Sequence, residues 1–407
     1  MSPYAGRKNV AKSFEESFDV IVCGGGVAGV AAALEAARAG LRTALLEKTI
    51  LPGGLATSGL INVYLPLCDG NGRQVTFGIA EELLRLSLRY GPGEVPAWRE
   101  ARGGVECARF QAVFSPASFA LALDEALVSA GVEIRFDTLA CSPVMDGSRV
   151  VGVEAETKAG RGLLRAGCVV DATGDADIAY RAGAPCTEGR NTLAMWALGA
   201  SQGLPGGATL GGAASGAVRM VRLGKCSQDE ADATSCRATD AHGVTEFVLQ
   251  CRAMLREHYR QAHERGGDSI RQSDFPVALP SMAQFRTTRR VVGQSTIRDG
   301  EDGQYRPDSI GLVADWRRAG PVWEIPYGAL LPVGIHGLLM AGRCISSDGD
   351  AWEVTRVIPP AALTGQVCGV AAALSAGSGA PPGQLKAEEI QRALAGKGIP
   401  FHIRDLK

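Results

Sequence analysis

The 407-residue sequence lacks a charge surplus, a long apolar run and an apolar N-terminal leader. Its 42 basic and 43 acidic side chains give a net charge of −1, which disfavours a nucleic-acid-binding protein because such proteins usually carry a basic surplus. A membrane span needs roughly 18 apolar residues, and the best candidate, residues 361–374, is interrupted by Thr364, Gly365 and Gln366. Residues 1–17 lack the apolar segment of a secretory signal. We therefore expect a cytoplasmic enzyme.

Cysteine and histidine do not form a clear ligand set either. None of the 11 cysteines is spaced as CxxC, and the five histidines do not cluster with cysteines, although His258 and His263 lie five residues apart near Cys251. Metal sites need clustered ligands, so we expect no metal. Cys23 and Cys168 stand in apolar runs, where a free cysteine packs as a small hydrophobic residue.

Glycine, in contrast, is abundant. The chain has 53 glycines, well above the usual share of about 7%. With 46% hydrophobic and 21% charged residues, the composition is that of a folded globular protein. The length exceeds what one hydrophobic core usually spans, so we expect two domains.

The residues from Phe18 onward have the pattern of a dinucleotide-binding strand, turn and helix. Phe18–Cys23 is a short β-branched run typical of a buried parallel strand, and it leads into GGGVAG, a match to GxGxxG. The alanine-rich stretch Val27–Ala39 favours a helix that ends at Gly40, and Leu41–Glu47 is a second apolar strand that ends in an acid. A lone GxGxxG is a weak signal, but this position between a strand and a helix supports nucleotide binding.

Each residue of this motif has a physical role in binding a pyrophosphate. Gly24 permits the tight turn, Gly26 lets a phosphate approach the backbone, and Gly29 lets the helix pack closely on the strand. The helix N-terminus adds N–H groups and the positive end of its dipole. Glu47 follows Gly29 by 18 residues, where a carboxylate accepts hydrogen bonds from ribose hydroxyls and repels a 2′-phosphate, so NADP is disfavoured.

Three later segments resemble parts of flavoproteins. Pro52–Gly59 (PGGLATSG) resembles the loop that passes the pyrophosphate and reaches toward the flavin ring. Val169–Asp177 (VVDATGDAD) is similar to the returning strand of FAD-binding domains. Leu338–Ala373 is similar to the last FAD-contacting segment of the FAD-dependent oxidoreductases related to the succinate dehydrogenase/fumarate reductase flavoproteins. The resemblance extends over roughly residues 18–374.

The motif and the resemblance together imply a set of FAD-binding residues. These are Gly24, Gly26, Val27, Ala28, Gly29, Glu47, Lys48, Gly54, Leu55, Ala56, Thr57, Ser58, Ala140, Thr173, Gly174, Asp175, Gly342, Arg343, Asp350, Ile358 and Ala361. Some respiratory relatives attach the flavin covalently through a histidine, but residues 1–241 contain none. We therefore expect non-covalent FAD.

The resemblance also implies a helix aimed at the flavin and one departure from the family pattern. A helix starting at Pro359–Ala362 would place its positive dipole end near the flavin and stabilise an anionic reduced ring. Where the family has a triplet like His-Glu-Ala, this chain has Gly349-Asp350-Ala351. Asp350 keeps the acid, but an imidazole is absent.

The fold expected from these anchors is α/β, with a Rossmann-like, glutathione-reductase-like FAD domain and an inserted α+β cap. The FAD domain is predicted to be discontinuous, at 17–185 and 323–378. The cap or substrate domain occupies 186–322, and 379–407 is predicted to be a peripheral tail.

Arginines are the candidates for substrate binding because a guanidinium stays charged and pairs with carboxylates through two hydrogen bonds. Arg356 precedes the helix aimed at the flavin, and Arg286 and Arg290 have helical spacing. These three are the predicted catalytic residues. For Arg356 a structural ion pair with Glu353 or Asp350 remains the alternative.

The predicted function is an FAD-dependent oxidoreductase that transfers a hydride between flavin N5 and a small organic substrate. The alternatives are an FAD carrier or escort without redox turnover, and a tRNA-modifying flavoprotein, which the net charge of −1 disfavours. We expect no nucleic-acid or membrane partner. The substrate, the direction of reaction, the external electron donor or acceptor and the oligomeric state stay open at this point.

Overall fold

The computed structural model describes residues 14–100, 110–201, 217–224, 236 and 238–406. Its main element is a seven-stranded mixed sheet in the order β5-β2-β1-β8-β7-β6, with β16 also paired to β8. The parallel strands are β5 (Glu133–Arg135), β2 (Thr43–Leu46), β1 (Glu15–Cys23), β8 (Gly160–Asp171) and β16 (Leu338–Met340), and β7 (Arg149–Thr157) and β6 (Leu139–Asp146) extend the sheet antiparallel. The predicted α/β class with a Rossmann-like sheet is confirmed.

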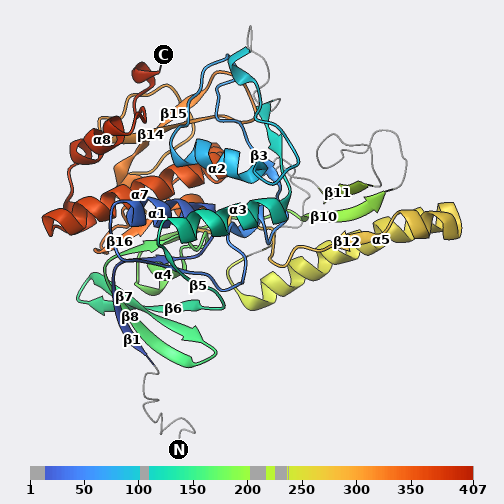
Figure 1. Ribbon diagram of the computed structural model, residues 1–407, viewed down its shortest axis with the longest axis horizontal. Helices are drawn as coiled ribbons and strands as arrows, with labels where there is room; N and C mark the ends of the chain where they lie inside the picture. The colour runs from blue at the N-terminus through green and yellow to red at the C-terminus, as the bar shows by residue number, and fades with distance from the viewer. Residues whose placement is uncertain (1–13, 101–109, 202–216, 225–235, 237, 407) are drawn as a thin grey trace, which may run out of the picture.

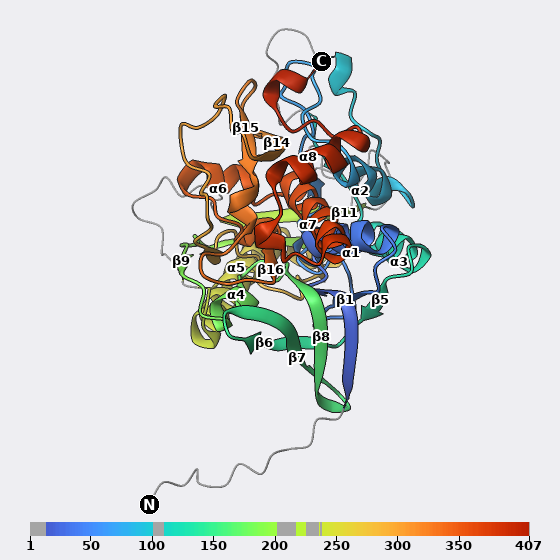
Figure 2. The same cartoon turned by 90° about the vertical axis from the view of Figure 1, so that its left-hand side faces the viewer.

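Helices α1 (Val27–Arg38), α3 (Pro116–Ser129) and α7 (Ile358–Ser378) pack on the parallel part of this sheet. Helices α2 (Ile79–Leu88) and α8 (Ala387–Gly396) join them through α7. Helix α1 packs along α7, and α7 also contacts α2 and α8; Figure 1 shows α1, α3 and α7 together above the sheet, and Figure 2 shows α1 beside α7 in the view turned by 90°. The short α4 (Asp177–Arg181) contacts β6 and β8.

The close contact of α1 with α7 depends on glycine. A Cβ on Gly365 would lie 2.1 Å from the carbonyl oxygen of Ala28, and one on Gly369 would lie 2.6 Å from Cβ of Glu35. The side chain of Gln366 accepts a hydrogen bond from Ile79 N (2.9 Å) and donates one to Glu35 (2.8 Å). The residues that interrupt the apolar run of α7 therefore fix its position.

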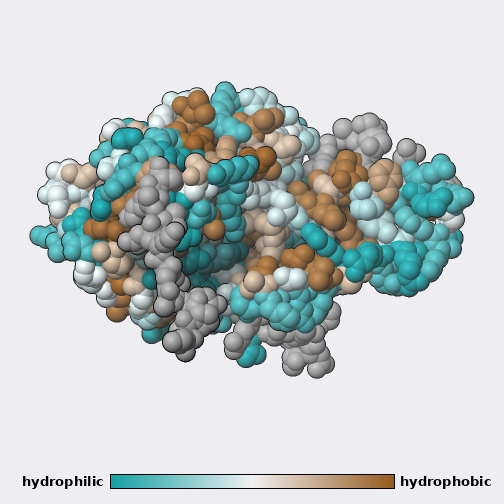
Figure 3. Space-filling model, turned by 90° about the horizontal axis from the view of Figure 1, so that it is seen from below, coloured by the Kyte–Doolittle hydropathy of each residue, from teal (hydrophilic) through white to brown (hydrophobic). Residues whose placement is uncertain are grey.

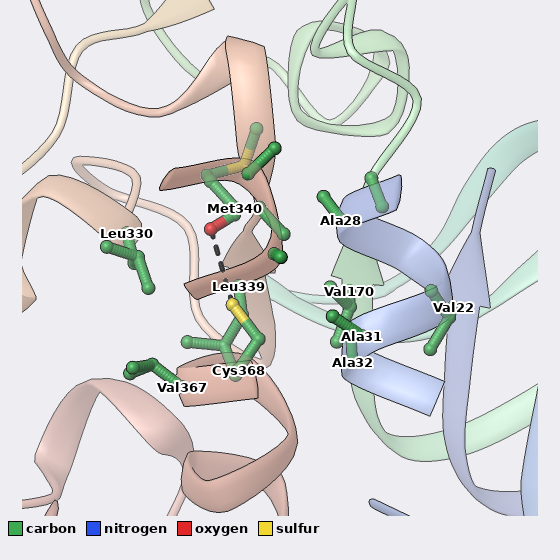
Figure 4. Packing of buried hydrophobic residues seen from close by; sticks show 14 of the residues in the cluster. Val22, Ala28, Ala31, Ala32, Val170, Leu330, Leu339, Met340, Val367 and Cys368 are labelled. Atoms are coloured by element: carbon green, nitrogen blue, oxygen red, sulfur yellow. Dashed lines mark hydrogen bonds between the residues drawn. The ribbon is translucent and has the colours of Figure 1, made fainter. Parts of the chain in front are cut away.

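Helix α7 is long and apolar enough to cross a membrane by length and composition, but 83% of its most apolar window is buried inside the protein. It is thus a core helix. Figure 4 shows Cys368 of α7 facing Met340 of β16, with the Cys368 thiol donating a hydrogen bond to the Met340 carbonyl (3.3 Å), while Val367 lies on the side of Leu330. Cys23 and Cys168 are buried as well, and burial raises the pKa of Cys168 to about 12, so its thiol stays protonated and packs as an apolar group.

A second, smaller unit combines a three-stranded sheet with a long helix that is kinked at Gly267 (φ +61°). The strands β11 (Ala217–Gly224), β10 (Ala194–Ser201) and β12 (Pro276–Ala278) are antiparallel, and α5 (Ala241–Ser273) packs on them. Their shared core is separate from the main one and includes Met195, Val221 and Phe247. Helix α5 reaches away from the body (Figure 1), and its far end is hydrophilic, whereas hydrophobic side chains gather nearer the body (Figure 3).

The remaining elements are short pairs and connections. They are the antiparallel pairs β3 (Val63–Tyr64) with β4 (Ala112–Val113), β9 (Cys186–Glu188) with β13 (Arg289–Val291), and β14 (Ser309–Ala314) with β15 (Val322–Pro326), together with α6 (Gly349–Thr355). Strand β14 packs on α7 and α8. The part of the predicted cap that contains β14 therefore packs on the main body.

The C-terminal segment is not peripheral, contrary to the prediction for 379–407. Ile390 and Leu394 of α8 are fully buried in the main core. Farther along, the carboxylate of Glu324 in β15 accepts a hydrogen bond from Ile403 N (2.8 Å) and contacts Nδ1 of the buried His402 (2.9 Å). The sequence of this segment predicts a short helix after a proline-rich turn, but it does not indicate that the helix packs into the main core.

Two glycines of α7 allow a matched test of the contact with α1. Gly365→Ala should lower the free energy of unfolding by about 1–3 kcal/mol because the new Cβ overpacks a backbone contact. Gly377→Ala is the control, since a Cβ there would meet nothing within 4 Å, and the helix propensity of alanine should leave stability unchanged or raise it by up to about 1 kcal/mol. Urea unfolding of both variants measures the difference; equal stabilities would contradict the role of Gly365.

Candidate functional site

A cavity opens at the carboxyl ends of β1, β2 and β8 and reaches the first residues of α1 and α7. This is the edge of a parallel sheet where nucleotides bind in doubly wound folds. The predicted residues at its wall are Gly24, Gly26, Val27, Ala28, Glu47, Lys48, Gly54, Leu55, Ala56, Ala140, Thr173, Gly174, Asp175, Gly342, Arg343, Ile358 and Ala361. We refer to it as the first cavity.

Four predicted cofactor residues lie outside this wall. A Cβ on Gly29 would lie 1.8 Å from the carbonyl oxygen of Gly24, so Gly29 serves helix packing. Thr57 donates a hydrogen bond to Pro52 O (2.6 Å), and Ser58 is buried behind the same loop. Asp350 lines a second cavity, described below.

The glycine turn leaves room for a ligand at one position in particular. Gly24 has φ +102°, and a Cβ there would lie 2.6 Å from Ala172 O, so the chain can turn only with glycine. Gly26 differs, because its Cβ would meet no protein atom within 4 Å although the residue lines the cavity. Space beside Gly26 is therefore kept free at the start of α1, where N–H groups and the helix dipole favour phosphate.

Glu47 is held rigidly at the same wall. It is 7% exposed, and its two carboxylate oxygens accept hydrogen bonds from Gly25 N and Thr49 N, both at 2.8 Å. A carboxylate offers about four acceptor positions, so acceptor capacity remains for ribose hydroxyls. The backbone contacts orient it.

The turn after β8 is organised by Asp171, a residue that was not predicted. Its buried carboxylate accepts hydrogen bonds from Thr173 Oγ1 (2.6 Å), Ile178 N (2.9 Å) and Ala179 N (3.0 Å). Burial raises its pKa. Asp171 thus shapes the Thr173–Asp175 turn and caps α4 without lining the cavity.

Arg343 ties this turn to the smaller unit. Its guanidinium contacts Asp175 Oδ1 (2.6 Å), Gly174 O (2.8 Å) and Phe285 O (2.6 Å). Because these three contacts occupy Nε, Nη1 and Nη2, Arg343 acts as a connecting residue at the cavity wall.

Other wall residues were missed by the sequence. They are Leu46, Gly53, Thr138, Leu139, Ala172, Asp177, Met282, Ala341 and Val357. Most of them are sequence neighbours of predicted residues at strand ends, so extending each predicted segment by one or two residues would have included them. Met282 comes from the segment that follows β12, and no local pattern identifies it.

A second cavity, of about 750 Å³, adjoins the first. Both cavities are lined by Leu55, Ala56, Arg356, Val357 and Ile358. The other residues of the second cavity are Ile61, Val63, Leu65, Gln111, Trp196, Arg222, Gln284, Phe285, Arg286, Asp299, Trp316, Arg317, Gly349, Asp350 and Glu353. Its walls therefore come from both the main body and the smaller unit.

The three predicted catalytic arginines have different environments. Arg356 lies where the cavities meet, and its guanidinium pairs with Glu353, with Nε 3.0 Å from Oε2. Arg286 lines the second cavity. Arg290 lines neither; it is 5% exposed and pairs with Asp348 at 3.0 Å.

The helical spacing expected for Arg286 and Arg290 is wrong, because Arg290 stands on strand β13, paired with β9. The alternative of a structural ion pair for Arg356 is realised with Glu353.

A side chain is disfavoured at the position of the expected imidazole. Gly349 has φ +53°, and a Cβ there would lie 2.2 Å from a carboxylate oxygen of Asp299. The other oxygen of Asp299 accepts a hydrogen bond from Ala351 N (2.9 Å). Asp350 pairs with Arg317 (2.8 Å), and this hydrogen bond lowers the pKa of Asp350.

The first turn of α7 has fewer free backbone N–H groups than a helix N-terminus usually offers. Pro359 and Pro360 carry no N–H, and Ala361 N donates to Val357 O (3.0 Å). Ile358 is thus the first helical residue with an amide N–H at the cavity wall. Within the described ranges, no three His, Cys, Asp or Glu side chains are placed to hold a metal.

Gly26→Val should yield folded protein without flavin, because the new side chain would enter the first cavity and touch no other protein atom at Cβ. Gly396→Val is the matched control, since a Cβ there also meets nothing within 4 Å and the residue ends α8 away from the cavity. Flavin absorbance per folded protein, with circular dichroism as the measure of folding, checks both. Normal flavin content in Gly26→Val would contradict the assignment.

Comparisons with known structures give the fold. A geranylgeranyl bacteriochlorophyll reductase-like protein from Thermoplasma acidophilum aligns with a TM-score of 0.51 at 14% identity, covering 94% of this chain and 84% of that one. The anhydrotetracycline hydroxylase OxyS from Streptomyces rimosus aligns with 0.44 at 15% identity, covering 92% and 65%. The aromatic hydroxylase CabE from angucycline biosynthesis aligns with 0.46 at 17%, covering 88% and 63%. The chain thus spans less than two thirds of each hydroxylase.

The sequence comparisons give the family. Curated proteins yield no match. The model of the family described as FAD dependent oxidoreductase, however, matches residues 19–197 and 207–394. This range includes the glycine turn, Glu47, the Thr173–Asp175 turn and both helices whose first residues line the first cavity. The chain belongs to the FAD dependent oxidoreductase family, and FAD is its cofactor.

Proposed function

We propose that the protein oxidises or reduces a small organic substrate in the second cavity, by hydride exchange with N5 of the flavin of FAD held in the first. The observation that carries this proposal is the wall common to both cavities, formed by Leu55, Ala56, Val357 and Ile358 with Arg356. Hydride transfer needs contact between the flavin and the substrate. A ligand in the first cavity and a ligand in the second can make this contact at the wall that the two cavities share.

The cofactor supplies the redox chemistry, because the flavin carries two electrons and a proton as hydride. The protein binds and orients. Glu47 is fixed by two backbone hydrogen bonds to face the first cavity. Ile61, Val63 and Leu65 give the second cavity an apolar side that excludes water. Glu353 holds Arg356 at the junction.

Proton exchange with the substrate falls to a carboxyl group. The described residues of the second cavity include neither histidine nor tyrosine. Asp350 is kept charged by Arg317, which lowers its pKa, and Glu353 is paired with Arg356. Asp299 accepts a hydrogen bond from the Ala351 amide and is paired with no arginine among the described residues, so we propose its carboxylate as the group that accepts a proton from the substrate.

We also propose the closer kinship to the succinate dehydrogenase/fumarate reductase flavoproteins. It is supported by the order of β16, the turn Gly342–Cys344, α6 and α7, which follows the expected segment. Gly349, which stands where the resemblance implies a histidine, sets this chain apart from that group.

A small-molecule enzyme acting in the cytoplasm, without nucleic-acid or membrane partner, is part of the same proposal. It is supported by the net charge of −1 and by the burial of α7.

The proposal includes non-covalent FAD. The described wall of the first cavity contains no histidine, cysteine or tyrosine that could be linked to a flavin. Acid precipitation of the purified protein should release all yellow colour into the supernatant; a yellow pellet would show a covalent bond.

Anaerobic mixing tests the reaction itself. Carboxylic acids, enones, amines and alcohols are added to the oxidised and the reduced protein while absorbance near 450 nm (approximate, from general flavin chemistry) is followed. At least one class should bleach or restore the flavin band. A flavin that responds to dithionite but to no organic class would favour an FAD carrier.

Arg356→Lys then tests the junction with the substrate found. Lysine keeps the charge but loses the planar fork. We expect the rate of flavin bleaching to fall at least about tenfold, or about 1.4 kcal/mol, with FAD content unchanged. Loss of FAD with a normal rate per remaining flavin would make Arg356 purely structural.

A further inference from the structure

The second cavity has a cationic side chain at its wall that faces an aromatic ring across two strands. Trp196 on β10 and Arg222 on β11 are direct cross-strand partners. Side chains at such positions lie on the same face of a sheet. The guanidinium carbon of Arg222 is 4.4 Å from the ring centroid of Trp196, a cation–π contact. Both residues line the cavity.

This pair is held in place relative to the loop that separates the two cavities. The side chain of Gln284 accepts a hydrogen bond from Trp196 N (2.8 Å) and donates to Trp196 O (2.9 Å) and to Gly59 O (2.6 Å). Gln284 is 5% exposed. The Trp196–Arg222 pair is therefore anchored to the end of the Gly54–Gly59 loop.

Arg222 differs from two other arginines of the cavity in its partners. Arg317 is neutralised by Asp315 and Asp350, and Arg356 pairs with Glu353. For Arg222 the contacts among the described residues are the Trp196 ring and Met220 Sδ, 3.0 Å from Nε. Within that part of the chain it has no carboxylate partner, and it is exposed. Its two Nη groups are thus available to an acidic ligand.

The rest of the wall gives the ligand a direction. Phe285 and Trp316 also line the cavity, and Trp316 lies at α6, where its Nε1 donates a hydrogen bond to Glu353 O (3.2 Å). Asp299 and Glu353 also line the cavity, and both belong to the group around α6: Asp299 bonds Ala351 N, and Glu353 lies within that helix. These carboxylates offer an acid no positive charge, and Glu353 is paired with Arg356, whereas Arg222, which has no carboxylate partner among the described residues, attracts an acid.

We propose that the second cavity binds organic acids with a planar ring body, whose carboxylate pairs with Arg222 and whose ring lies against the aromatic wall. The inference rests on the proposed function only in identifying this cavity as the substrate site. A guanidinium binds a carboxylate through two parallel hydrogen bonds, and an aromatic residue beneath it keeps the planar group oriented. Arg222 is then the residue that selects acids over neutral analogues.

The test uses 2-naphthoate and its uncharged match 2-naphthamide on the FAD-loaded protein. Titrations follow the visible flavin spectrum and, independently, calorimetric heat. 2-Naphthoate should bind and perturb the flavin band, and 2-naphthamide and acetate should bind at least tenfold more weakly. Arg222→Gln should raise the Kd of 2-naphthoate at least tenfold and leave that of 2-naphthamide unchanged. Arg222→Lys, which keeps only the charge, should fall between.

Arg256→Gln is the control, because Arg256 is an exposed arginine of α5 in the same smaller unit and lines neither of the two cavities. Its Kd values should equal those of the wild type. Equal binding of the acid and the amide, or an unchanged Kd in Arg222→Gln, would overturn the proposal. The proposed redox function is tested separately. It fails if no class of organic compound exchanges electrons with the flavin, even when the binding of 2-naphthoate depends on Arg222.

Discussion

The structure depends on the close approach of α1 and α7. Gly365 and Gly369 let the backbones of the two helices meet, and Gly342 lies at their first turns, where a Cβ would be 2.8 Å from Cβ of Ala28 and 3.7 Å from Cβ of Ala361. Side chains at these points would force the helices apart. Because of this contact, the N-terminal ends of both helices reach one cavity, although they stand more than 300 residues apart in the sequence.

Arginine ion pairs then give the site its shape. Arg343 joins the turn after β8 to Phe285, and Arg356 is fixed by Glu353 at the junction of the two cavities. Partly buried charges are costly unless they are paired, so these arginines hold wall segments in one arrangement. Arg222 differs from Arg343 and Arg356, because its guanidinium has no carboxylate partner among the described residues.

The sequence predicts well what is local. The strand, glycine turn and helix at Gly24–Gly29, and the acid at Glu47, follow from spacing within about 30 residues, and the family match supports the same reading. It fails where distant segments meet. Three features depend on tertiary contacts that sequence periodicity does not encode: the approach of Asp299 to Gly349, the docking of the C-terminal segment through His402, and the strand conformation of Arg290.

A crystal structure of the protein purified with its flavin tests the central assignment most directly. It should show FAD with its pyrophosphate beside Gly26 and the start of α1, its ribose at Glu47, and the flavin ring between the Gly54–Ala56 turn and Val357–Ile358, facing the second cavity. FAD bound elsewhere, or oriented with its flavin away from the wall shared by the two cavities, would contradict the assignment.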